Sequence, residues 1–514
     1  MRRILFSLSL SLSSFIYIIV VFIILLQGAL VFLMQAGFAM VCAGAVQDKN
    51  VMNTTLKNFL DGCGAALGFF CFGYAFAFGG CKFGGPTTFI GNVNFFLSGV
   101  EENFFLSPVV NPLAFWFFQY AFAATAATIV AGTLAERCQM GAYLMYSFLL
   151  TGLIYPVVVH AVWSPNGFLS PTNADRLLFG SGAIDFSGCG VIHMTGGITA
   201  LVAAKILGPR TGRFFDQRGM ALTKPTVMKQ HSVALQGLGT LLLWFGWYGF
   251  NSGSALYTTV APRSAFAARA VVTTSLGPAS GAISALLINF YITDRETGEG
   301  IFDLSVALNG ALSGLVSITA GCTVIEPWAA IIAGVVGGLL LVIVSRLLVR
   351  LRIDDAVDAI PVHLPNGIWG LIVVGLLANP TYVEQIYHSS HAGWFYSWSQ
   401  GSADGRLLAA NLTLALFVIG WVTCTMTPFF LLLHYLGWFR SDPLEEIIGL
   451  DVSYHGASTL HLENDEEYKE FLKFKEARRR SHGLLPKFQR NGNIGIDDFS
   501  LNRSTIYDME ASQH

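Results

Sequence analysis

The sequence predicts an all-α polytopic membrane protein, and two features of its composition lead to that fold class. Of its 514 residues, 53% are hydrophobic and only 12% are charged, whereas soluble domains carry about 25% charged residues. The apolar residues also gather in runs of about 20, which is the length of helix that crosses the hydrocarbon core of a bilayer. Most of the predicted surface therefore faces lipid.

Eleven apolar runs follow one another along the chain, and they predict eleven transmembrane helices. Residues 1–14 are interpreted as an N-terminal extension, residues 15–436 as the eleven-helix domain, and residues 437–514 as a polar tail outside the membrane. The Met-Arg-Arg start resembles a signal peptide, but no small-residue cleavage motif follows it, so its cleavage stays open. The approximate bounds of the runs are 15–46, 58–80, 112–134, 140–163, 186–207, 231–257, 265–293, 301–321, 328–349, 364–379 and 407–436.

The basic residues of the predicted loops indicate the orientation, because cytoplasmic loops are enriched in Lys and Arg. With the N-terminus outside, the outer loops contain Lys82, Arg176, Arg263 and Arg406. Arg2 and Arg3 favour the opposite orientation. The much longer inner list predicts the N-terminus outside and the tail inside: Lys49, Lys57, Arg137, Arg210, Arg213, Arg218, Lys224, Lys229, Arg295, Arg346, Arg350 and Arg352.

An odd number of helices is typical of two inverted five-helix repeats followed by one further helix. The sequence supports this arrangement at one pair of positions. Asp185 precedes His193 by eight residues at the start of the fifth run, and Asp355 precedes His363 by eight at the start of the tenth. Inverted halves bring the two histidines together near the membrane midplane. Because ionisable residues inside membranes are costly, we expect both to line a pore.

The aspartates have simpler interpretations. Asp185, at the start of a helix, is expected to cap free backbone amides. Asp354, Asp355 and Asp358 are expected to form a hydrated entrance to the tenth helix.

Other functional classes receive no support. The net charge of -2 gives no reason to expect nucleic acid as a partner. The eight cysteines show no metal-binding spacing and are interpreted as small buried hydrophobes. No nucleophile–base or metal constellation stands out, so we expect no enzyme activity, no metal and no cofactor.

Several segments resemble the ammonium transporters (the Amt/Mep/Rh family), and the pattern is Amt-type rather than Rh-type. The resemblance covers residue 30 to about residue 456. It implies eleven helices with the N-terminus outside, a homotrimer with one pore per subunit, and a plasma membrane location. The matching segments are MQAGFAMVCAG (34–44), FQYAF (118–122), LAER (134–137), GAIDFSGCGVIH (182–193), LLWFGWYGFNSGSA (242–255), AGCTVIEPWAAIIAG (320–334), DDAVDAIPVH (354–363) and GLDVSYHG (449–456).

The resemblance also assigns roles to residues. Trp163, Phe122 and Ser254 resemble the outer site that recruits the ammonium cation, and Phe122 with Phe250 resembles the stacked pair that closes the pore below it. The twin histidines His193 and His363 resemble the lining of the narrow part. The supporting residues are Asp185, Gln119, Trp247 and Asn251.

Three further features follow from the resemblance. The segment Leu364-Pro365-Asn366 departs from the glycines that many members carry after the second histidine, and Ser252 also departs from the family pattern. Because Pro lacks a backbone donor, the sequence leaves undecided whether the helix continues in the family's way past His363. The GLDVSYHG segment resembles the regulatory tail, in which Ser453 stands where plant relatives carry a phosphorylatable Thr, so a kinase or a regulatory protein is an expected partner.

The expected function is ammonium transport. The cation is recruited at the aromatic site and loses a proton, and ammonia then passes the histidines, with a proton moving alongside. Two alternatives stay open: an electroneutral gas channel of the Rh type, and an ammonium receptor that signals through the tail.

Overall fold

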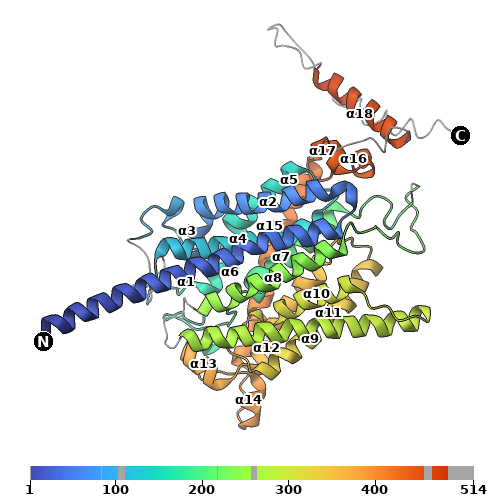
Figure 1. Ribbon diagram of the computed structural model, residues 1–514. Helices are drawn as coiled ribbons and strands as arrows, with labels where there is room; N and C mark the ends of the chain where they lie inside the picture. Colours follow the sequence, from blue (N-terminus) through green and yellow to red (C-terminus); the bar gives the residue numbers. More distant parts are fainter. Residues whose placement is uncertain are drawn as a thin grey trace, which may run out of the picture. The chain divides into compact units, whose positions relative to one another are not determined.

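A computed structural model describes residues 2–80, 82, 84–101, 110–216, 218–255, 263–456 and 466–483. Residues 1–458 form one compact unit, a bundle of helices without a β-strand in those ranges (Figure 1). The helices are α1 (Arg2–Ala45), α2 (Val51–Gly68), α3 (Tyr74–Phe78), α4 (Pro112–Leu134), α5 (Met140–Leu149), α6 (Tyr155–Trp163), α7 (Thr195–Leu207), α8 (Val233–Ser254), α9 (Arg263–Thr297), α10 (Leu304–Thr319), α11 (Pro327–Arg350), α12 (Ala359–Leu377), α13 (Pro380–Tyr387), α14 (Trp394–Ser399), α15 (Arg406–Tyr435), α16 (Pro443–Ile448) and α17 (Leu450–His455).

Ten stretches of the described residues are helical, long and apolar enough to cross a membrane. The remaining predicted run, 301–321, corresponds to α10, which is apolar but only 16 residues long. Three stretches contain a π-helical turn: Phe69–Gly73 after α2, Leu150–Ile154 after α5, and Cys189–Met194 (η6) before α7. The ten stretches are Tyr17–Ala45, Asp48–Phe78, Pro112–Leu134, Met140–Trp163, Cys189–Leu207, Val233–Ser254, Ser264–Thr297, Pro327–Arg350, Ala359–Leu377 and Arg406–Tyr435.

Close backbone approach holds the bundle together, as the glycine-rich composition suggests. A Cβ atom built at Gly334 of α11 would lie 2.1 Å from the carbonyl oxygen of Gly277 in α9. One turn along, a Cβ at Gly338 would lie 2.4 Å from the carbonyl oxygen of Gly281. Helices in lipid gain stability from such tight packing, because lipid tails are as apolar as their side chains.

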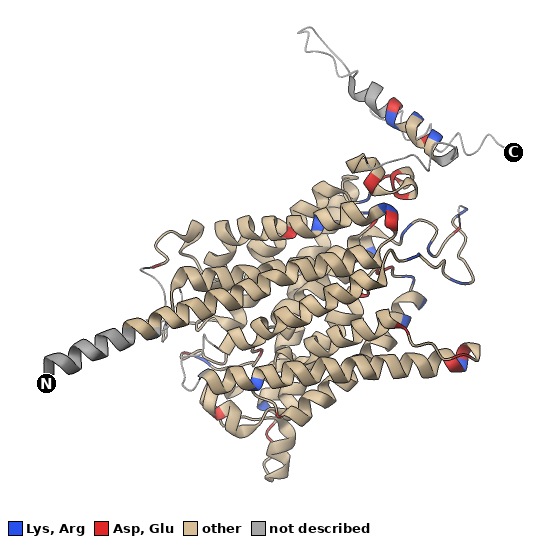
Figure 2. Cartoon of the chain, in the orientation of Figure 1, with Lys and Arg blue, Asp and Glu red and all other residues tan. Residues whose placement is uncertain are grey.

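The charged residues gather where α16 and α17 lie, which we call the tail end of the bundle (Figure 2). Arg210 links the loops there, because it pairs with Glu136 at 2.6 Å and with Asp354 at 2.8 Å. Burial opposes ionisation of Asp354, but Arg137 and Arg210 outweigh it and hold the pKa of that carboxyl below its usual range. This ion cluster fixes the loops that lead into α5, α8 and α12.

Three basic residues counted as loop charges are buried in the bundle. Lys57 lies inside α2, where 1% of its surface is exposed, and Arg137 and Arg210 are also buried. The prediction that α2 begins near residue 58 was wrong, since the helix starts at Val51. Hydropathy does not reveal the first turns of α2, because they carry polar side chains that face the interior of the bundle. The predicted orientation therefore rests on fewer exposed loop charges.

The structure describes the elements at the two ends of the predicted domain. Helix α1 runs from Arg2 to Ala45 without a break at residue 15. At the other end, the bundle unit continues past 436 to Ser458, and the second unit begins at Thr459. The described part of that second unit is helix α18 (Glu466–Gly483).

Candidate functional site

Two buried histidines from different halves of the chain meet inside the bundle. His193 lies in η6 and His363 lies one turn into α12. Their Nδ1 atoms are 3.2 Å apart, and their ring centroids are 5.2 Å apart with the planes 18° from parallel. One Nδ1 must donate and the other accept, so the two neutral rings carry different tautomers. The contact that the repeat predicted between these residues is present.

Asp185 holds the segment that carries His193. Its Oδ1 accepts hydrogen bonds from the backbone N–H groups of Gly188 and Cys189, and its Oδ2 accepts from those of Gly190 and Val191, at 2.7–2.9 Å. Burial raises the pKa of Asp185 to about 6, although the four donors favour the charged carboxylate. The geometry matches the predicted capping role.

Asp355 has a comparable place before His363. Its Oδ2 accepts from the backbone N–H of Ile360 at 2.7 Å, and its Oδ1 accepts from the Thr133 hydroxyl at 3.0 Å. Helix α12 consequently begins at Ala359 rather than near residue 364 as predicted. The two aspartates thus anchor the two histidine segments in corresponding ways.

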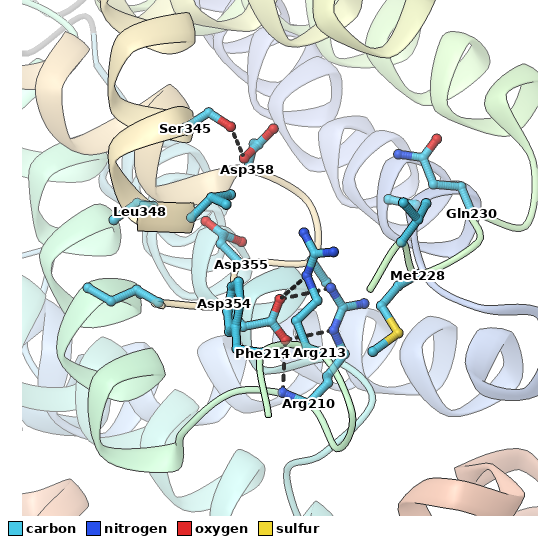
Figure 3. Close-up of a pocket in the computed structure, with 15 residues that line it drawn as sticks. Arg210, Arg213, Phe214, Met228, Gln230, Ser345, Leu348, Asp354, Asp355 and Asp358 are labelled. Carbon is cyan, nitrogen blue, oxygen red and sulfur yellow. Dashed lines mark hydrogen bonds and ion pairs between the residues drawn. The ribbon is translucent and has the colours of Figure 1, made fainter. Parts of the chain in front are cut away.

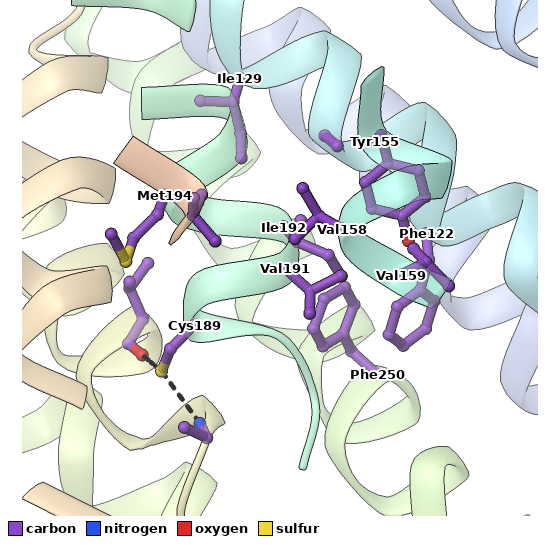
Figure 4. Packing of buried hydrophobic residues seen from close by; sticks show 14 of the residues in the cluster. Phe122, Ile129, Tyr155, Val158, Val159, Cys189, Val191, Ile192, Met194 and Phe250 are labelled. Atoms are coloured by element: carbon purple, nitrogen blue, oxygen red, sulfur yellow. Dashed lines mark hydrogen bonds between the residues drawn. The ribbon is translucent and has the colours of Figure 1, made fainter. Parts of the chain in front are cut away.

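A stacked pair of phenylalanines lies beside the histidines. The rings of Phe122 (α4) and Phe250 (α8) are 4.1 Å apart and 8° from parallel, and both are buried. The Phe250 centroid is 5.9 Å from that of His193. Figure 4 shows the two rings packed against Val158, Val159 and the η6 turn. No room for a hydrated ion remains between rings at this separation.

Trp163 lies on the other side of Phe122, at the end of α6. Its ring centroid is 5.9 Å from that of Phe122, with the planes 73° apart. The indole Nε1 donates to the carbonyl oxygen of Asp185 at 2.7 Å, which fixes the ring. Ser254 belongs to the same region, but its hydroxyl donates to the Phe250 carbonyl oxygen of its own helix at 3.0 Å. The three aromatic rings of Trp163, Phe122 and Phe250 thus contact one another. Ser254 instead forms its hydrogen bond within its own helix.

Of the other supporting residues, two form side-chain hydrogen bonds to neighbouring helices and one has an oxygen without a partner among the described residues. Trp247 stacks on His193 at 5.1 Å and 15°, and its Nε1 donates to the Thr319 hydroxyl at 2.9 Å. Asn251 donates to the Thr274 hydroxyl at 2.9 Å, which ties α8 to α9. Gln119 is buried, but its side-chain oxygen has no hydrogen-bond partner in the described part of the chain.

Sequence reasoning missed three contacts around these residues. Phe118 packs 4.6 Å from Phe122, Phe38 lies 6.5 Å from His363, and Thr319 holds the Trp247 indole. Phe38 falls inside a matching segment, 34–44, which is the one signal that could have singled it out.

Two cavities lie toward the tail end. A small one borders His363 and is lined by Phe38, Cys42, Thr128 and Val357 among others. The second has a volume of about 250 Å³ and is lined by the charged residues Arg210, Arg213, Asp354, Asp355 and Asp358 (Figure 3). The three aspartates therefore border one cavity, and Asp354 is paired with Arg210.

Comparison with known proteins identifies the family. The sequence profile of the Ammonium Transporter Family matches residues 21–460. The chain belongs to the ammonium transporter family. Its relatives include ammonium transporter 1 member 3 of Solanum lycopersicum, which is 40% identical over 465 residues covering 88% of this chain and 96% of the relative. Ammonium transporter 1 member 1 of Oryza sativa subsp. japonica is 42% identical, with 84% and 83% covered.

Solved structures of the ammonium transporter family share the fold. A protein named Sensor Amt Protein superimposes with a TM-score of 0.71 at 30% identity, covering 86% of this chain and 99% of that one. Mep2 of Candida albicans superimposes with a TM-score of 0.71 at 25% identity, covering 87% and 91%. The chain is thus an integral membrane protein of a transporter family and not an enzyme.

The departure after His363 leaves the helix intact. Helix α12 continues through Pro365 to Leu377. Pro365 cannot donate to the carbonyl oxygen of Pro361, but the Asn366 side-chain amide donates to that oxygen at 3.1 Å and to the Val362 oxygen at 3.0 Å. Asn366 therefore replaces the hydrogen bond that Pro365 removes.

Replacing Asn366 by Leu should destabilise the protein by about 2 kcal/mol, because the Pro361 carbonyl oxygen loses its buried partner. Thermal unfolding of purified protein measures the effect. The substitution Pro365→Ala supplies a backbone N–H to the same oxygen, so Asn366→Leu should cost much less when it is combined with Pro365→Ala. Equal losses in both backgrounds would contradict the compensation.

Proposed function

We propose that this chain is an ammonium transporter that binds the cation, removes its proton and conducts ammonia past His193 and His363. The observation that carries the proposal is the stack of Phe122 on Phe250 next to the buried histidine pair. An unpaired charge in hydrocarbon costs about 3 to over 10 kcal/mol, and loss of the proton removes most of that cost. The narrow, apolar contact therefore favours the neutral molecule.

Capture precedes deprotonation in this mechanism. Ammonium is almost wholly protonated at neutral pH, as is a lysine head group with its pKa of about 10.4. A cation over the face of Trp163 or Phe122 gains about 0.5–2 kcal/mol. The indole N–H is already bound to Asp185, so the ring presents its face and not its donor. Ser254 lies one turn beyond Phe250 on α8 and supplies a hydroxyl oxygen.

The histidines suit ammonia because each neutral imidazole donates at one nitrogen and accepts at the other. The Nδ1 atoms bond to each other, which leaves the Nε2 atoms to face the passing molecule. Nε2 of His193 has no partner within the described residues. Potassium is excluded because it has no proton to lose.

The tail end faces the cytoplasm in the proposed orientation, the protein resides in the plasma membrane, and its assembly is a homotrimer. Supporting observations are the family membership and the ion cluster at the tail end. Residues 1–14 are an N-terminal extension, 15–436 are the transporter domain and 437–514 form a regulatory tail.

An ammonium sensor is the second candidate, supported by the similarity to Sensor Amt Protein. It would use the same binding residues and signal through the tail. A channel of electroneutral type is less supported, because Trp163 lies against Phe122 in the place where a cation is recruited.

The test is an electrical recording from oocytes that express the chain. Millimolar ammonium should evoke a saturable inward current that potassium and sodium do not evoke. Surface labelling shows that the protein has reached the membrane. Labelled protein without a current would reject electrogenic transport in favour of a neutral channel or a sensor.

The tail offers a regulatory site at Ser453. Its hydroxyl donates to the carbonyl oxygen of Gly449 at 2.9 Å. Nearby, the Asp451 carboxylate accepts from the backbone N–H groups of Met52 and Asn53 at 2.9 and 2.7 Å, which docks α17 on the start of α2. A phosphate on Ser453 adds about two negative charges beside Asp451, so it opposes docking.

We expect Ser453→Asp to lower the ammonium current at least about fivefold, because the added charge disrupts this docking. Ser453→Ala adds no charge, so this variant should retain most of the ammonium current. Both variants are compared at equal surface expression. Full current from Ser453→Asp would remove the regulatory role.

A further inference from the structure

A hollow in the protein surface lies at the start of α15, away from the histidine site. Its volume is about 910 Å³, and Phe179, Ser402, Asp404, Arg406 and Ala409 are among the residues that line it. Helix α15 leads at its C-terminus into α16 and is about 45 Å long. The hollow therefore lies far from the tail end, at the start of a helix that is long and apolar enough to cross a membrane.

The hollow contains one positive and one negative side chain. Nε of Arg406 lies 3.9 Å from Oδ1 of Asp404, and 61% of the Arg406 side chain is exposed. Neither terminal nitrogen of this guanidinium has a hydrogen-bond partner in the described part of the chain. The guanidinium and the carboxylate beside it therefore offer a ligand two opposite charges.

Asp404 is held in place and stays charged. Its Oδ2 lies 2.6 Å from Nδ1 of His391, and its Oδ1 accepts from the backbone N–H of Arg406 at 3.0 Å. Its own backbone N–H donates to the Ser397 hydroxyl at 2.7 Å. Burial opposes ionisation of Asp404, but the Arg406 backbone and His391 hold the pKa of its carboxyl below the usual range. The negative member of the pair is thus preformed.

Aromatic side chains place the hollow at the level of the lipid head groups. Trp398 of α14 is 63% exposed and Phe179 is 50% exposed, and exposed aromatic rings gather where a membrane meets water. In Figure 1, α14 projects from the body of the bundle. Beyond Arg406, α15 exposes Leu412 and Leu416, which suits contact with acyl chains. A molecule in the hollow therefore has water on one side and lipid tails on the other.

We propose that the hollow binds a phospholipid whose head group carries a phosphate and a primary ammonium group. The planar guanidinium of Arg406 suits the phosphate, because it can donate two parallel N–H bonds to the phosphate oxygens. The ammonium group donates to the Asp404 carboxylate, which has acceptor capacity left beside His391 and the Arg406 N–H. The acyl chains follow the exposed leucines of α15. The lipid thus joins the loop before α15 to the loop that carries Phe179, and this role is independent of the proposed transport function.

Native mass spectrometry of the purified full-length protein measures the Kd of the bound lipid, with dioleoylphosphatidylethanolamine as the probe. Arg406→Gln removes the charge and the paired donors, so the Kd should rise at least about tenfold. The wild type should bind this lipid at least about threefold more tightly than phosphatidylcholine, whose quaternary ammonium has no N–H to donate to Asp404. Asp404→Asn should abolish that preference.

Arg176→Gln is the matched control, because Arg176 is an exposed arginine of the loop that carries Phe179 and does not line the hollow. It should leave the Kd within about twofold of the wild-type value. Equal Kd values for Arg406→Gln and Arg176→Gln would overturn the site.

Two further lipids and ligands separate the parts of the proposal. Wild-type protein that binds phosphatidylglycerol as tightly as phosphatidylethanolamine would overturn the assignment of the ammonium group to Asp404. Displacement of the lipid by equimolar phosphoethanolamine would overturn the lipid source in favour of a soluble ligand. If Asp404→Asn fails to fold, the comparison of the two arginine variants decides the question.

Discussion

Replacing His363 by Glu is expected to let potassium through a protein that otherwise rejects it. The wild-type pair of imidazoles is buried and offers a cation no compensating charge, so only a molecule that sheds its charge can pass. A carboxylate in this position attracts any monovalent cation, and each gain of about 1.4 kcal/mol is about tenfold in relative permeability. We expect the ratio of potassium to ammonium current to rise at least about tenfold. His193→Glu should act in the same direction, because its ring faces the same space.

The control for this prediction is His363→Gln, which keeps a neutral side chain that can both donate and accept. It should lower the ammonium current without admitting potassium. Currents are recorded with each cation alone, at equal surface expression. Complete potassium exclusion in both acidic variants would contradict the view that the histidines impose selectivity by remaining neutral.

Removing the Asp185 carboxylate is expected to have the largest effect on stability. Asp185→Ala leaves four buried N–H groups of the η6 turn without an acceptor. Hydrogen bonds to charged groups contribute about 1.5–3 kcal/mol each, and because they are not additive we expect a total loss of about 4 kcal/mol. The turn that carries His193 should lose its geometry, and the backbone carbonyl of residue 185, which accepts from the Trp163 indole, is then held less firmly.

Asp185→Asn removes the charge but keeps the size of the side chain. Its single oxygen can still accept hydrogen bonds from two of the four N–H groups. It should lose about half as much stability as Asp185→Ala. Thermal unfolding in detergent, followed by size-exclusion chromatography, measures both variants. Asp355→Ala provides a comparison, because that carboxylate accepts fewer backbone N–H groups and should cost less. Similar stability of Asp185→Ala and wild type would contradict the capping role.

Much of the membrane domain could be predicted because hydropathy acts over whole helices. Ten of the predicted runs correspond to helices long enough to cross a bilayer. The run at 301–321 became the shorter α10. Boundaries failed where polar side chains turn inward. The start of α2 was missed because its polar residues Asn53, Thr54 and Lys57 are buried. The start of α12 was missed because Asp355 caps it from the preceding loop.

The candidate site was predictable in part. The equal spacing of Asp185–His193 and Asp355–His363 singled out both histidines, and the family resemblance added Phe122, Phe250 and Trp163. The partners of these residues were not predictable. Trp247 stacks on His193, and the Asn366 side chain supplies the hydrogen bond that Pro365 cannot donate. Neither contact can be inferred from the spacing of residues in the sequence.

By itself, the sequence determined that this protein lies in a membrane, how its apolar helices succeed one another, and which ionisable residues stand at equivalent places in two halves. These properties are carried by composition and spacing along the chain, since each helix must separately satisfy its backbone and face lipid. Only the tertiary structure decided how the histidine rings meet, with one Nδ1 facing the other, and how closely the phenylalanines stack. It also decided that the polar face of α2 is buried. Those features depend on how helices distant in the chain pack against one another, and packing in lipid follows side-chain shape rather than hydrophobicity.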